Sequence, residues 1–192
     1  MVQDKFNQSK KVHMDKLYLP DKSKKGDVDI YIRTLIDKIN SFDDYFTTSS
    51  CSGRIILIKH SPKKNQVEWF FVSHDSVNIE KTLEEIMKIC NNNSELLWLK
   101  VEGFILHVAC RNIEKATDLL QKVRDSGFKR SGIISAGNKI MIEILSTETL
   151  DVPISENNKL LVSEKYLKCV LKLCNQKLKK THSRIDFLKD GI

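Results

Sequence analysis

The sequence predicts an α+β protein whose largely antiparallel hairpins pack against helices. Three observations support this fold class: two β-rich runs follow one another closely, the tetrapeptide NIEK occurs twice behind similar strands, and an amphipathic helix closes the chain. Hairpins and helices grouped in this way favour α+β over alternating α/β architecture. The 192 residues contain no Pro/Gly/Ser-rich linker, so we expect one domain covering residues 1–192.

The first predicted elements are a helix and the buried strand that follows it. Five apolar residues share one helical face, and Asp27 is well placed to cap the helix. The run from Ile55 to Ile58 is aliphatic throughout and is typical of a buried strand. We interpret Thr47 to Arg54, which is rich in hydroxyl groups, as the loop that enters this strand. The residues on the helical face are Val28, Ile32, Leu35, Ile36 and Ile39.

The next part of the chain predicts a doubled strand, strand, helix unit. The runs RIILIKH and VEWFFVSH are joined by SPKKNQ, whose proline and asparagine suit a hairpin loop. Aligning Glu68–Val72 with Glu102–Leu106 also aligns the two NIEK segments without a gap. Asn78 and Asn112 are therefore expected to cap two equivalent helices.

A third hairpin and a long basic helix complete the predicted fold. The second NIEK helix is expected to stop at Gly127, a residue type common after helix ends. Ala136-Gly137 separates KRSGIIS from NKIMIEILS, which indicates a hairpin. The last helix, at about residues 160–189, has an apolar face opposite a lysine-bearing face. The apolar residues are Leu167, Val170, Leu171, Cys174 and Leu178, and the lysines are Lys165, Lys168, Lys172 and Lys179.

The net charge of +7 is concentrated at the two ends of the chain. Residues 1–26 carry seven lysines against three aspartates, and residues 151–192 carry nine basic against five acidic residues. Basic ends around a neutral middle suit a polyanion such as nucleic acid, because neutralised phosphates release counterions. A solvated lysine-rich surface is the alternative interpretation.

The lack of long apolar runs and the pattern of cysteines indicate an intracellular protein without a metal site. No apolar run reaches the length of a membrane span, and the N-terminus lacks the apolar centre of a secretion signal. We expect a cytoplasmic protein. The five cysteines form no C-x-x-C pair and are odd in number, so we expect reduced thiols, no disulfide framework and no metal site.

Five blocks of sequence carry a resemblance to a known family. They are DKSKKGDVD, DDYFTTSSCSGRI, FVSHD, LWLKVEGFILHVACR and GFKRSGII, in this order along the chain. Here the sequence resembles the tRNA wybutosine-synthesising protein 3 family. The first twenty residues and the C-terminal helix contain no matching motif.

The resemblance implies an S-adenosylmethionine-dependent methyltransferase of tRNA modification in wybutosine biosynthesis. Its substrate would be phenylalanine tRNA, methylated on a ring nitrogen of the tricyclic wybutosine precursor at the modified guanosine 3′-adjacent to the anticodon. The implied fold is the family's own and not the Rossmann type, and no G-x-G loop occurs in the sequence. The alternatives are a non-catalytic RNA-binding module that uses the basic ends and the serine-rich loop, and a regulatory protein that senses a nucleotide.

With the resemblance, the hydroxyl-rich segment is interpreted as a cofactor site. Hydroxyl groups can hydrogen-bond a ligand, a glycine allows close approach, and an arginine can bind a carboxylate or phosphate at two points. A serine-rich turn with an exposed arginine is the alternative, and for His107 a buried core histidine. The expected cofactor residues are Thr48, Ser49, Ser50, Gly53, Arg54 and His107.

His74 and Asp75 are the catalytic candidates, since a histidine accepts a proton near neutral pH and a carboxylate can orient a base. As neighbours in an extended chain they point to opposite faces, so adjacency does not make them a dyad. The alternative is that Asp75 or Ser76 only helps to start a helix. Cys51 is interpreted as a small packed side chain, because methylation of nitrogen needs no covalent enzyme intermediate.

Basic and aromatic residues are the candidates for tRNA binding. Trp98 is expected to stack on a purine-like ring, although a strand tryptophan also commonly fills a core. Lysine and arginine next to small residues suit phosphate contacts. The candidates are Lys22, Lys24, Lys25, Trp98, Lys100, Arg111, Lys129, Arg130 and Ser131.

Overall fold

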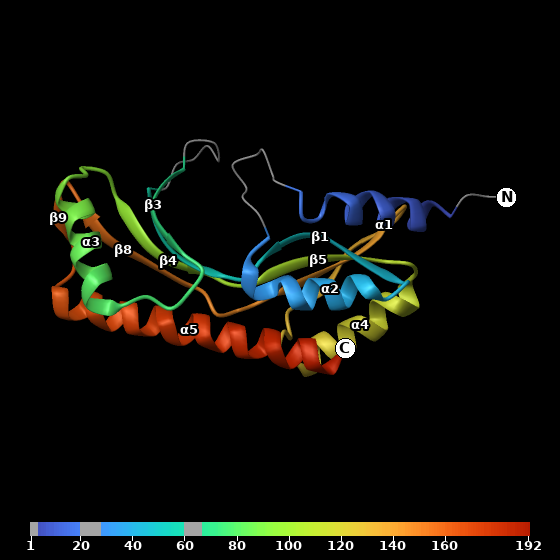
Figure 1. Cartoon of the computed structure of the whole chain (residues 1–192). Coiled ribbons are helices and arrows are strands. Elements are labelled where there is room, and N and C mark those ends of the chain that lie inside the picture. The colour runs from blue at the N-terminus through green and yellow to red at the C-terminus, as the bar shows by residue number, and fades with distance from the viewer. Residues whose placement is uncertain (1–3, 20–27, 60–66) are drawn as a thin grey trace. The chain divides into compact units, whose positions relative to one another are not determined.

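The structure is a computed structural model that describes residues 4–19, 28–59 and 67–192 (Figure 1). Among these residues, none of the helices combines the length and apolarity needed to cross a membrane. All five cysteines are free thiols, and burial raises the pKa of Cys110 and Cys174 to about 12. In chain order the elements are α1 (Lys5–Lys16), η1 (Ile30–Ile32), α2 (Arg33–Ser41), β1 (Tyr45–Cys51), β2 (Arg54–Lys59), β3 (Glu68–Ser73), α3 (Ile79–Asn91), β4 (Leu97–Glu102), β5 (Ile105–Cys110), α4 (Ile113–Asp125), β6 (Gly132–Ala136), β7 (Ile140–Leu145), β8 (Leu150–Glu156), β9 (Lys159–Leu160) and α5 (Glu164–Gly191).

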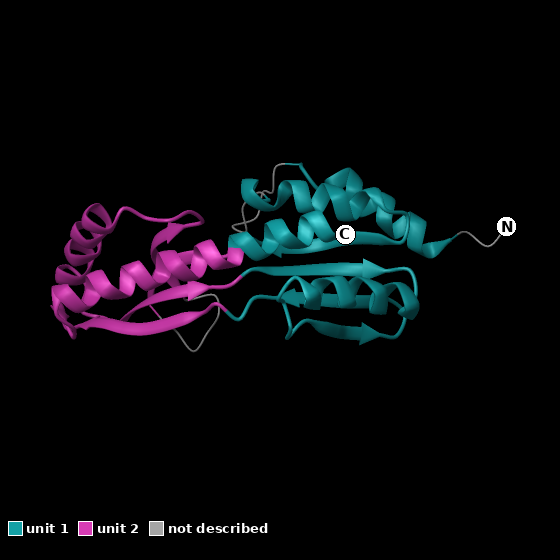
Figure 2. Cartoon of the chain, turned by 90° about the horizontal axis from the view of Figure 1, so that it is seen from below, with its two compact units in different colours: residues 1–52, 104–147, 182–192 teal, residues 53–103, 148–181 magenta. Residues whose placement is uncertain are grey.

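The chain forms two compact units, each built from separate segments of sequence (Figure 2). Unit 1 comprises residues 1–52, 104–147 and 182–192, and unit 2 comprises residues 53–103 and 148–181. Each unit has its own antiparallel sheet and its own hydrophobic core. The α+β class with antiparallel sheets is therefore confirmed.

Unit 1 is built on a four-stranded sheet in the order β1-β5-β7-β6. Alternate residues of its strands, such as Leu106 and Ile142, point to a core completed by α2, α4 and the end of α5. The opposite face is contacted by α1, where the ring of Phe6 lies 5.2 Å from that of Phe46 in β1. One face of this sheet therefore forms the core, and the other carries α1 and polar side chains.

Unit 2 is built on a five-stranded sheet in the order β3-β2-β4-β8-β9. Leu83 of α3 and Leu171 of α5 share one hydrophobic cluster with Leu99 of β4, so both helices cover the same sheet face. Along β4, buried and half-buried residues alternate strictly. Trp98 and Lys100 therefore lie on the face opposite this core.

Both NIEK helix starts are confirmed. The side chain of Asn78 accepts a hydrogen bond from the backbone N–H of Lys81 at 3.1 Å, and Asn112 accepts one from Lys115 at 2.9 Å. Gly127 follows α4 with φ of +92°, the left-handed region that favours glycine. The β2–β3 and β6–β7 hairpins are also antiparallel pairs, as predicted. The connecting segment SPKKNQ lies outside the described residues.

The prediction of a loop from Thr47 to Arg54 is wrong. Residues Tyr45–Cys51 form β1, which pairs with β5 and shifts register between Thr47 and Ser49. Threonine favours strands, and a strand with one solvent-facing side tolerates serine. Only Ser52 and Gly53 connect β1 to β2.

Two further boundaries differ from the sequence prediction. The helix expected from Val28 begins as a 3-10 turn, and α2 itself starts at Arg33; the expected cap, Asp27, lies outside the described residues. The C-terminal helix starts at Glu164, because Lys159–Leu160 form the short strand β9 paired with β8.

The doubled unit exists in sequence order but not in strand pairing. The order strand, strand, helix occurs as β2, β3, α3 and again as β4, β5, α4. Strand β2 pairs with β3, whereas β4 pairs with β2 and β8, and β5 pairs with β1 and β7. Strands β4 and β5 therefore belong to different sheets.

Candidate active site

A hydrogen-bonded chain of three side chains lies across neighbouring strands of unit 1. Ser49, His107 and Glu143 stand opposite one another on β1, β5 and β7. Residues opposite one another in antiparallel strands project to the same sheet face. Ser49 Oγ lies 2.7 Å from Nδ1 of His107, and Nε2 of His107 lies 2.9 Å from Oε1 of Glu143. Register alone thus brings three distant parts of the sequence together.

The carboxylate of Glu143 determines which nitrogen of His107 carries a proton. A carboxylate only accepts hydrogen bonds, so Nε2 is the donor in this pair. In the neutral ring, Nδ1 therefore accepts a hydrogen bond from the Ser49 hydroxyl. This arrangement can receive a proton at the exposed serine and pass one on to the imidazole.

His107 is not the buried core histidine considered as an alternative. Its side chain is 26% exposed and lies between the hydroxyl of Ser49 and the carboxylate of Glu143, while its strand neighbours Leu106 and Val108 point to the core. Glu143 was not among the site residues predicted from the sequence. The signal was present in β7, where a charged residue stands between the buried Ile142 and Ile144.

The six expected cofactor residues are divided between the two units. Thr48, Ser49, Ser50 and His107 belong to unit 1, and Gly53 and Arg54 belong to unit 2. Thr48 and Ser49 are exposed next to the register shift of β1, and Ser50 is half-buried. Gly53 is buried with φ of +93°, a conformation that side-chain-bearing residues rarely adopt.

Arg54 is held by two different partners within unit 2. Its Nε and Nη2 both lie 2.6 Å from Oε2 of Glu102, the residue opposite it in the sheet. Its guanidinium carbon also lies 4.1 Å from the centre of the Trp69 ring, a typical cation–π distance. The planar cation is thus oriented by a carboxylate at its edge and an aromatic ring at its face.

His74 and Asp75 follow the end of β3 in unit 2. Nδ1 of His74 lies 3.1 Å from the carbonyl oxygen of Gly53, so this nitrogen donates and carries the proton. Asp75 is exposed, and its backbone N–H and carbonyl both bond the hydroxyl of Ser73. The residue that caps α3 is Asn78 and not Asp75.

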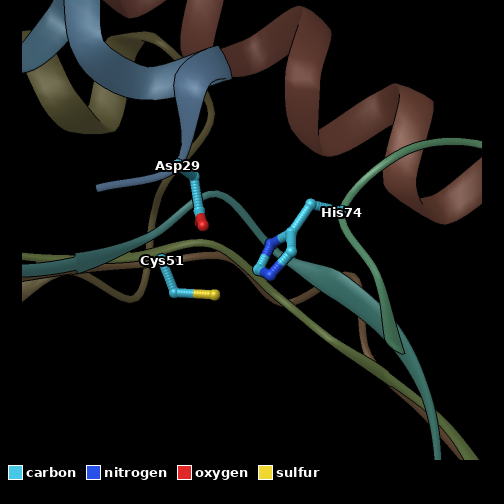
Figure 3. Close-up of side chains that lie close together, drawn as sticks. All are labelled: Asp29, Cys51 and His74. Carbon is cyan, nitrogen blue, oxygen red and sulfur yellow. The ribbon is translucent and has the colours of Figure 1, made fainter. Parts of the chain in front are cut away.

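Figure 3 shows the side chain of His74 together with those of Asp29 and Cys51. Asp29 and Cys51 belong to unit 1, and His74 belongs to unit 2. The carboxylate of Asp29 accepts a hydrogen bond of 2.6 Å from the backbone N–H of Ser52. Asp29 therefore anchors the segment that directly follows β1.

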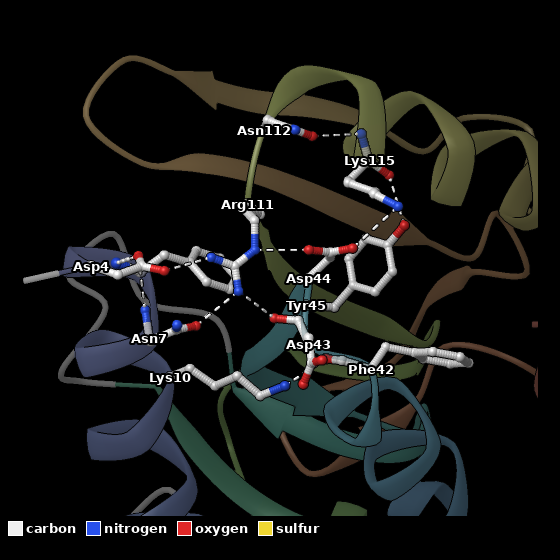
Figure 4. Close-up of polar contacts among 11 residues, drawn as sticks. Asp4, Asn7, Lys10, Phe42, Asp43, Asp44, Tyr45, Arg111, Asn112 and Lys115 are labelled. Carbon is white, nitrogen blue, oxygen red and sulfur yellow. Dashed lines mark hydrogen bonds and ion pairs between the residues drawn. The ribbon is translucent and has the colours of Figure 1, made fainter.

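Arg111 docks α1 against the rest of unit 1 (Figure 4). Its Nε donates to Asp44 at 2.7 Å, Nη1 donates to Asp4 at 2.7 Å, and Nη2 donates to Asn7 at 2.8 Å and to the carbonyl of Asp43. Arg111 makes four side-chain hydrogen bonds in this network, so its role in holding α1 in place explains why an arginine stands here. A contact with tRNA, as predicted from the sequence, is not needed to explain the presence of Arg111.

The remaining tRNA candidates fall into three environments. Lys100 forms an ion pair of 3.0 Å with Asp151 on the face of the sheet that also carries Trp98. Lys129 and Arg130 are exposed, whereas Ser131 is buried and its hydroxyl accepts a hydrogen bond from the backbone of Leu145. The three candidates outside the described residues are Lys22, Lys24 and Lys25.

Solved structures with this fold are known. A protein of Pyrococcus horikoshii, PH1069, has 36% sequence identity and a TM-score of 0.87 over 96% of this chain and 94% of that chain. A hypothetical protein from Aeropyrum pernix has 27% identity and a TM-score of 0.70 over 84% of this chain and 95% of that chain. The fold expected from the resemblance is thus confirmed.

Comparison with protein families gives the same result at the level of sequence. The chain is 41% identical over 175 residues to tRNA(Phe) 7-((3-amino-3-carboxypropyl)-4-demethylwyosine(37)-N(4))-methyltransferase 1 of Pyrococcus furiosus, covering 86% of this chain and 88% of the relative. It is 38% identical over 188 residues to the tRNA wybutosine-synthesizing protein 3 homolog of Danio rerio, covering 95% and 72%. The family model described as Methyltransferase TYW3 matches residues 8–192. The chain therefore belongs to the methyltransferase TYW3 family, and its methyl donor is S-adenosylmethionine.

Proposed function

We propose that the protein methylates N4 of a 4-demethylwyosine derivative at position 37 of phenylalanine tRNA. The observation that carries this proposal is the similarity to relatives whose names specify that reaction. The relative from Thermococcus sibiricus is 37% identical over 196 residues, covering 100% of this chain and 96% of its own. The name of the relative from Pyrococcus furiosus specifies the same reaction, and this relative is 41% identical to the chain.

The reaction requires a proton acceptor, and Ser49, His107 and Glu143 are suited to that role. Bound S-adenosylmethionine supplies a methyl group on a sulfonium centre. Moving the methyl carbon from sulfur to a nitrogen that bears hydrogen breaks the carbon–sulfur bond and obliges this nitrogen to release a proton. Ser49 is exposed and accepts the proton at Oγ while its own proton moves to Nδ1 of His107, 2.7 Å away. Glu143, 2.9 Å from Nε2, stabilises the imidazolium that forms.

The charges of Arg54 and Glu102 are complementary to those of an α-amino acid group. They place a guanidinium and a carboxylate 2.6 Å apart, and such a pair complements a ligand carboxylate and ligand ammonium. S-adenosylmethionine carries both groups, and so does the 3-amino-3-carboxypropyl substituent in the names of the relatives. We assign Arg54 and Glu102 to binding one of these ends.

The match over residues 8–192 includes segments of both units. It supports the proposal that residues 1–192 work as one methyltransferase domain. We further propose that the protein acts in the cytoplasm, where tRNA and the methyl donor are both available.

The test is transfer of labelled methyl from S-adenosylmethionine to phenylalanine tRNA that carries the 4-demethyl precursor. We expect one methyl per tRNA, located on N4 by mass spectrometry of the excised nucleoside. The control is the same tRNA with unmodified guanosine at position 37, which should accept no methyl group. Binding of the precursor tRNA without any transfer would contradict the proposal and favour the non-catalytic RNA-binding alternative.

A further inference from the structure

The first part of α5 carries a concentration of positive charge that α3 and α4 lack. Residues 164–181 hold six lysines and one glutamate. In the same unit, α3 holds two lysines and three glutamates, and in unit 1 α4 holds three basic and three acidic residues. Soluble helices usually intersperse the two signs of charge, as α3 and α4 do. The lysine excess of α5 therefore needs its own explanation.

Three lysines of α5 form a stripe opposite its buried face. Leu167, Leu171, Cys174 and Leu178 point into the core of unit 2. Lys165, Lys172 and Lys179 are exposed and seven residues apart, and we call them the α5 lysine stripe. Seven residues are close to two helical turns, so the three side chains are aligned along roughly 21 Å of helix.

Acidic neighbours pair with three other lysines of α5. Lys168 forms an ion pair of 2.7 Å with Glu80, and Glu148 binds both Lys177 and Lys180. Within the described part of the chain, neither Lys165 nor Lys172 has an acidic partner. Two positive charges of the stripe are thus available to an anion from outside.

We infer that the α5 lysine stripe binds the sugar-phosphate backbone of a double-helical stem of the substrate tRNA. The stripe and an RNA backbone are complementary in charge, because aligned, exposed ammonium groups match closely spaced phosphates and displace their counterions. No aromatic side chain lies between the lysines on the stripe, where Cys169 and Gln176 are exposed instead. Lysines alone contact phosphate without reading bases, so the stripe positions the tRNA rather than selecting it. This inference rests on the proposed function for the identity of the RNA.

The test compares two double variants of the full-length protein that remove the same charge. Lys165→Gln/Lys172→Gln alters the stripe, and Lys81→Gln/Lys88→Gln is the control, with exposed lysines at the same spacing on the mixed-charge helix α3. Glutamine resembles lysine in helix propensity, and thermal melts check that both variants fold. Binding to unmodified phenylalanine tRNA is measured across a series of salt concentrations.

The stripe variant should bind tRNA more weakly than the parent, and its affinity for tRNA should depend less steeply on salt concentration. At roughly 0.9 in log–log slope per phosphate contact, two lysines account for a slope change of about 1.8, and for roughly 10- to 60-fold weaker binding near 0.1 M salt. Duplex RNA should compete for the parent better than a single-stranded homopolymer. In methyl-transfer assays KM for tRNA should rise, while kcat stays at the parental value because these lysines do not contact the reacting base.

Three results would overturn the inference. The first is a slope and affinity equal to those of the control variant. The second is single-stranded RNA competing as well as duplex RNA. The third is a stripe variant that loses binding to phosphatidylserine vesicles while its tRNA binding is unchanged, which would assign the stripe to a lipid surface. If the parent binds tRNA but transfers no methyl group, the proposed function fails, and the comparison of salt slopes still decides this inference.

Discussion

Oε1 of Glu143 lies 2.9 Å from Nε2 of His107, and the two residues stand opposite each other on adjacent strands of unit 1. This contact leaves Nδ1 of His107 directed at the hydroxyl of Ser49. A carboxylate in this position orients the ring and determines which of its nitrogens carries the proton.

Glu143→Gln should slow methyl transfer more than it weakens binding. Glutamine keeps the shape of the side chain but loses the negative charge that stabilises the imidazolium. One charge-assisted hydrogen bond corresponds to roughly 1.5–3 kcal/mol, or about 10- to 100-fold in rate. The measurement is single-turnover methyl incorporation, with tRNA and donor affinities determined in parallel. Glu84→Gln, an exposed residue of α3, is the matched control, and equal rates for the two variants would show that Glu143 has no part in transfer.

Arg54→Lys should lose nearly as much function as Arg54→Ala. Lysine keeps the charge but lacks the planar group that binds Glu102 at its edge and lies over Trp69. The loss expected is again about 10- to 100-fold in transfer or ligand affinity, whereas Ser50→Ala should cost about 1 kcal/mol. Methyl incorporation and direct titration with S-adenosylmethionine measure the two effects. Parental turnover and affinity in both folded arginine variants would remove Arg54 from the site.

Acidification should release α1 from the rest of unit 1. The hydrogen bond from Arg111 is the main cause that lowers the pKa of the Asp4 carboxyl below its usual 3.8, and hydrogen bonds from Lys115 and Arg111 lower the pKa of Asp44. A carboxyl whose folded pKa lies below the unfolded one stabilises the fold above the unfolded value, and this stability is lost as pH falls through the folded pKa. The docking of α1 should thus persist down to about pH 4 and weaken below it.

Amide hydrogen exchange measures the docking of α1 directly. Arg111→Ala should speed exchange in Lys5–Lys16 at neutral pH, where the parent stays protected, and should reduce the pH dependence of that protection, of which the Asp4 cap of α1 retains a part. Amides of β5 serve as the internal control, since they are held by sheet pairing. Unchanged exchange in α1 would show that Phe6 and the other apolar contacts suffice to hold it.

Removing either helix cap should destabilise the fold by about 1 kcal/mol. Asn78 and Asn112 each accept a hydrogen bond from the third residue of their helix, and alanine leaves that backbone N–H without this partner. Denaturant unfolding of Asn78→Ala and Asn112→Ala measures the loss. Gln176→Ala, at an exposed position inside α5, is the control and should not be destabilised, because alanine is the better helix former.

The sequence by itself determined the features that depend on residues close together in the chain. Helix caps such as Asn78 and Asn112, the glycine after α4, and the β2–β3 and β6–β7 hairpins depend on residues a few positions apart. Their chemistry is therefore visible in a linear pattern. The five motif blocks likewise identified the family, since they report common descent and need no coordinates.

Strand pairing over long distances is what only the tertiary structure decided. Ser49 and His107 are 58 positions apart, and His107 and Glu143 are 36 apart, yet sheet register brings them into one hydrogen-bonded chain. The hydroxyl-rich segment before Ile55 resembles a loop until its partner β5 is known, because serine and threonine suit a half-exposed strand as well as a turn. Strands β4 and β5 follow each other in sequence but join different sheets. Local side-chain periodicity shows which face of a strand is buried, whereas its hydrogen-bonding partner depends on the packing of the whole unit.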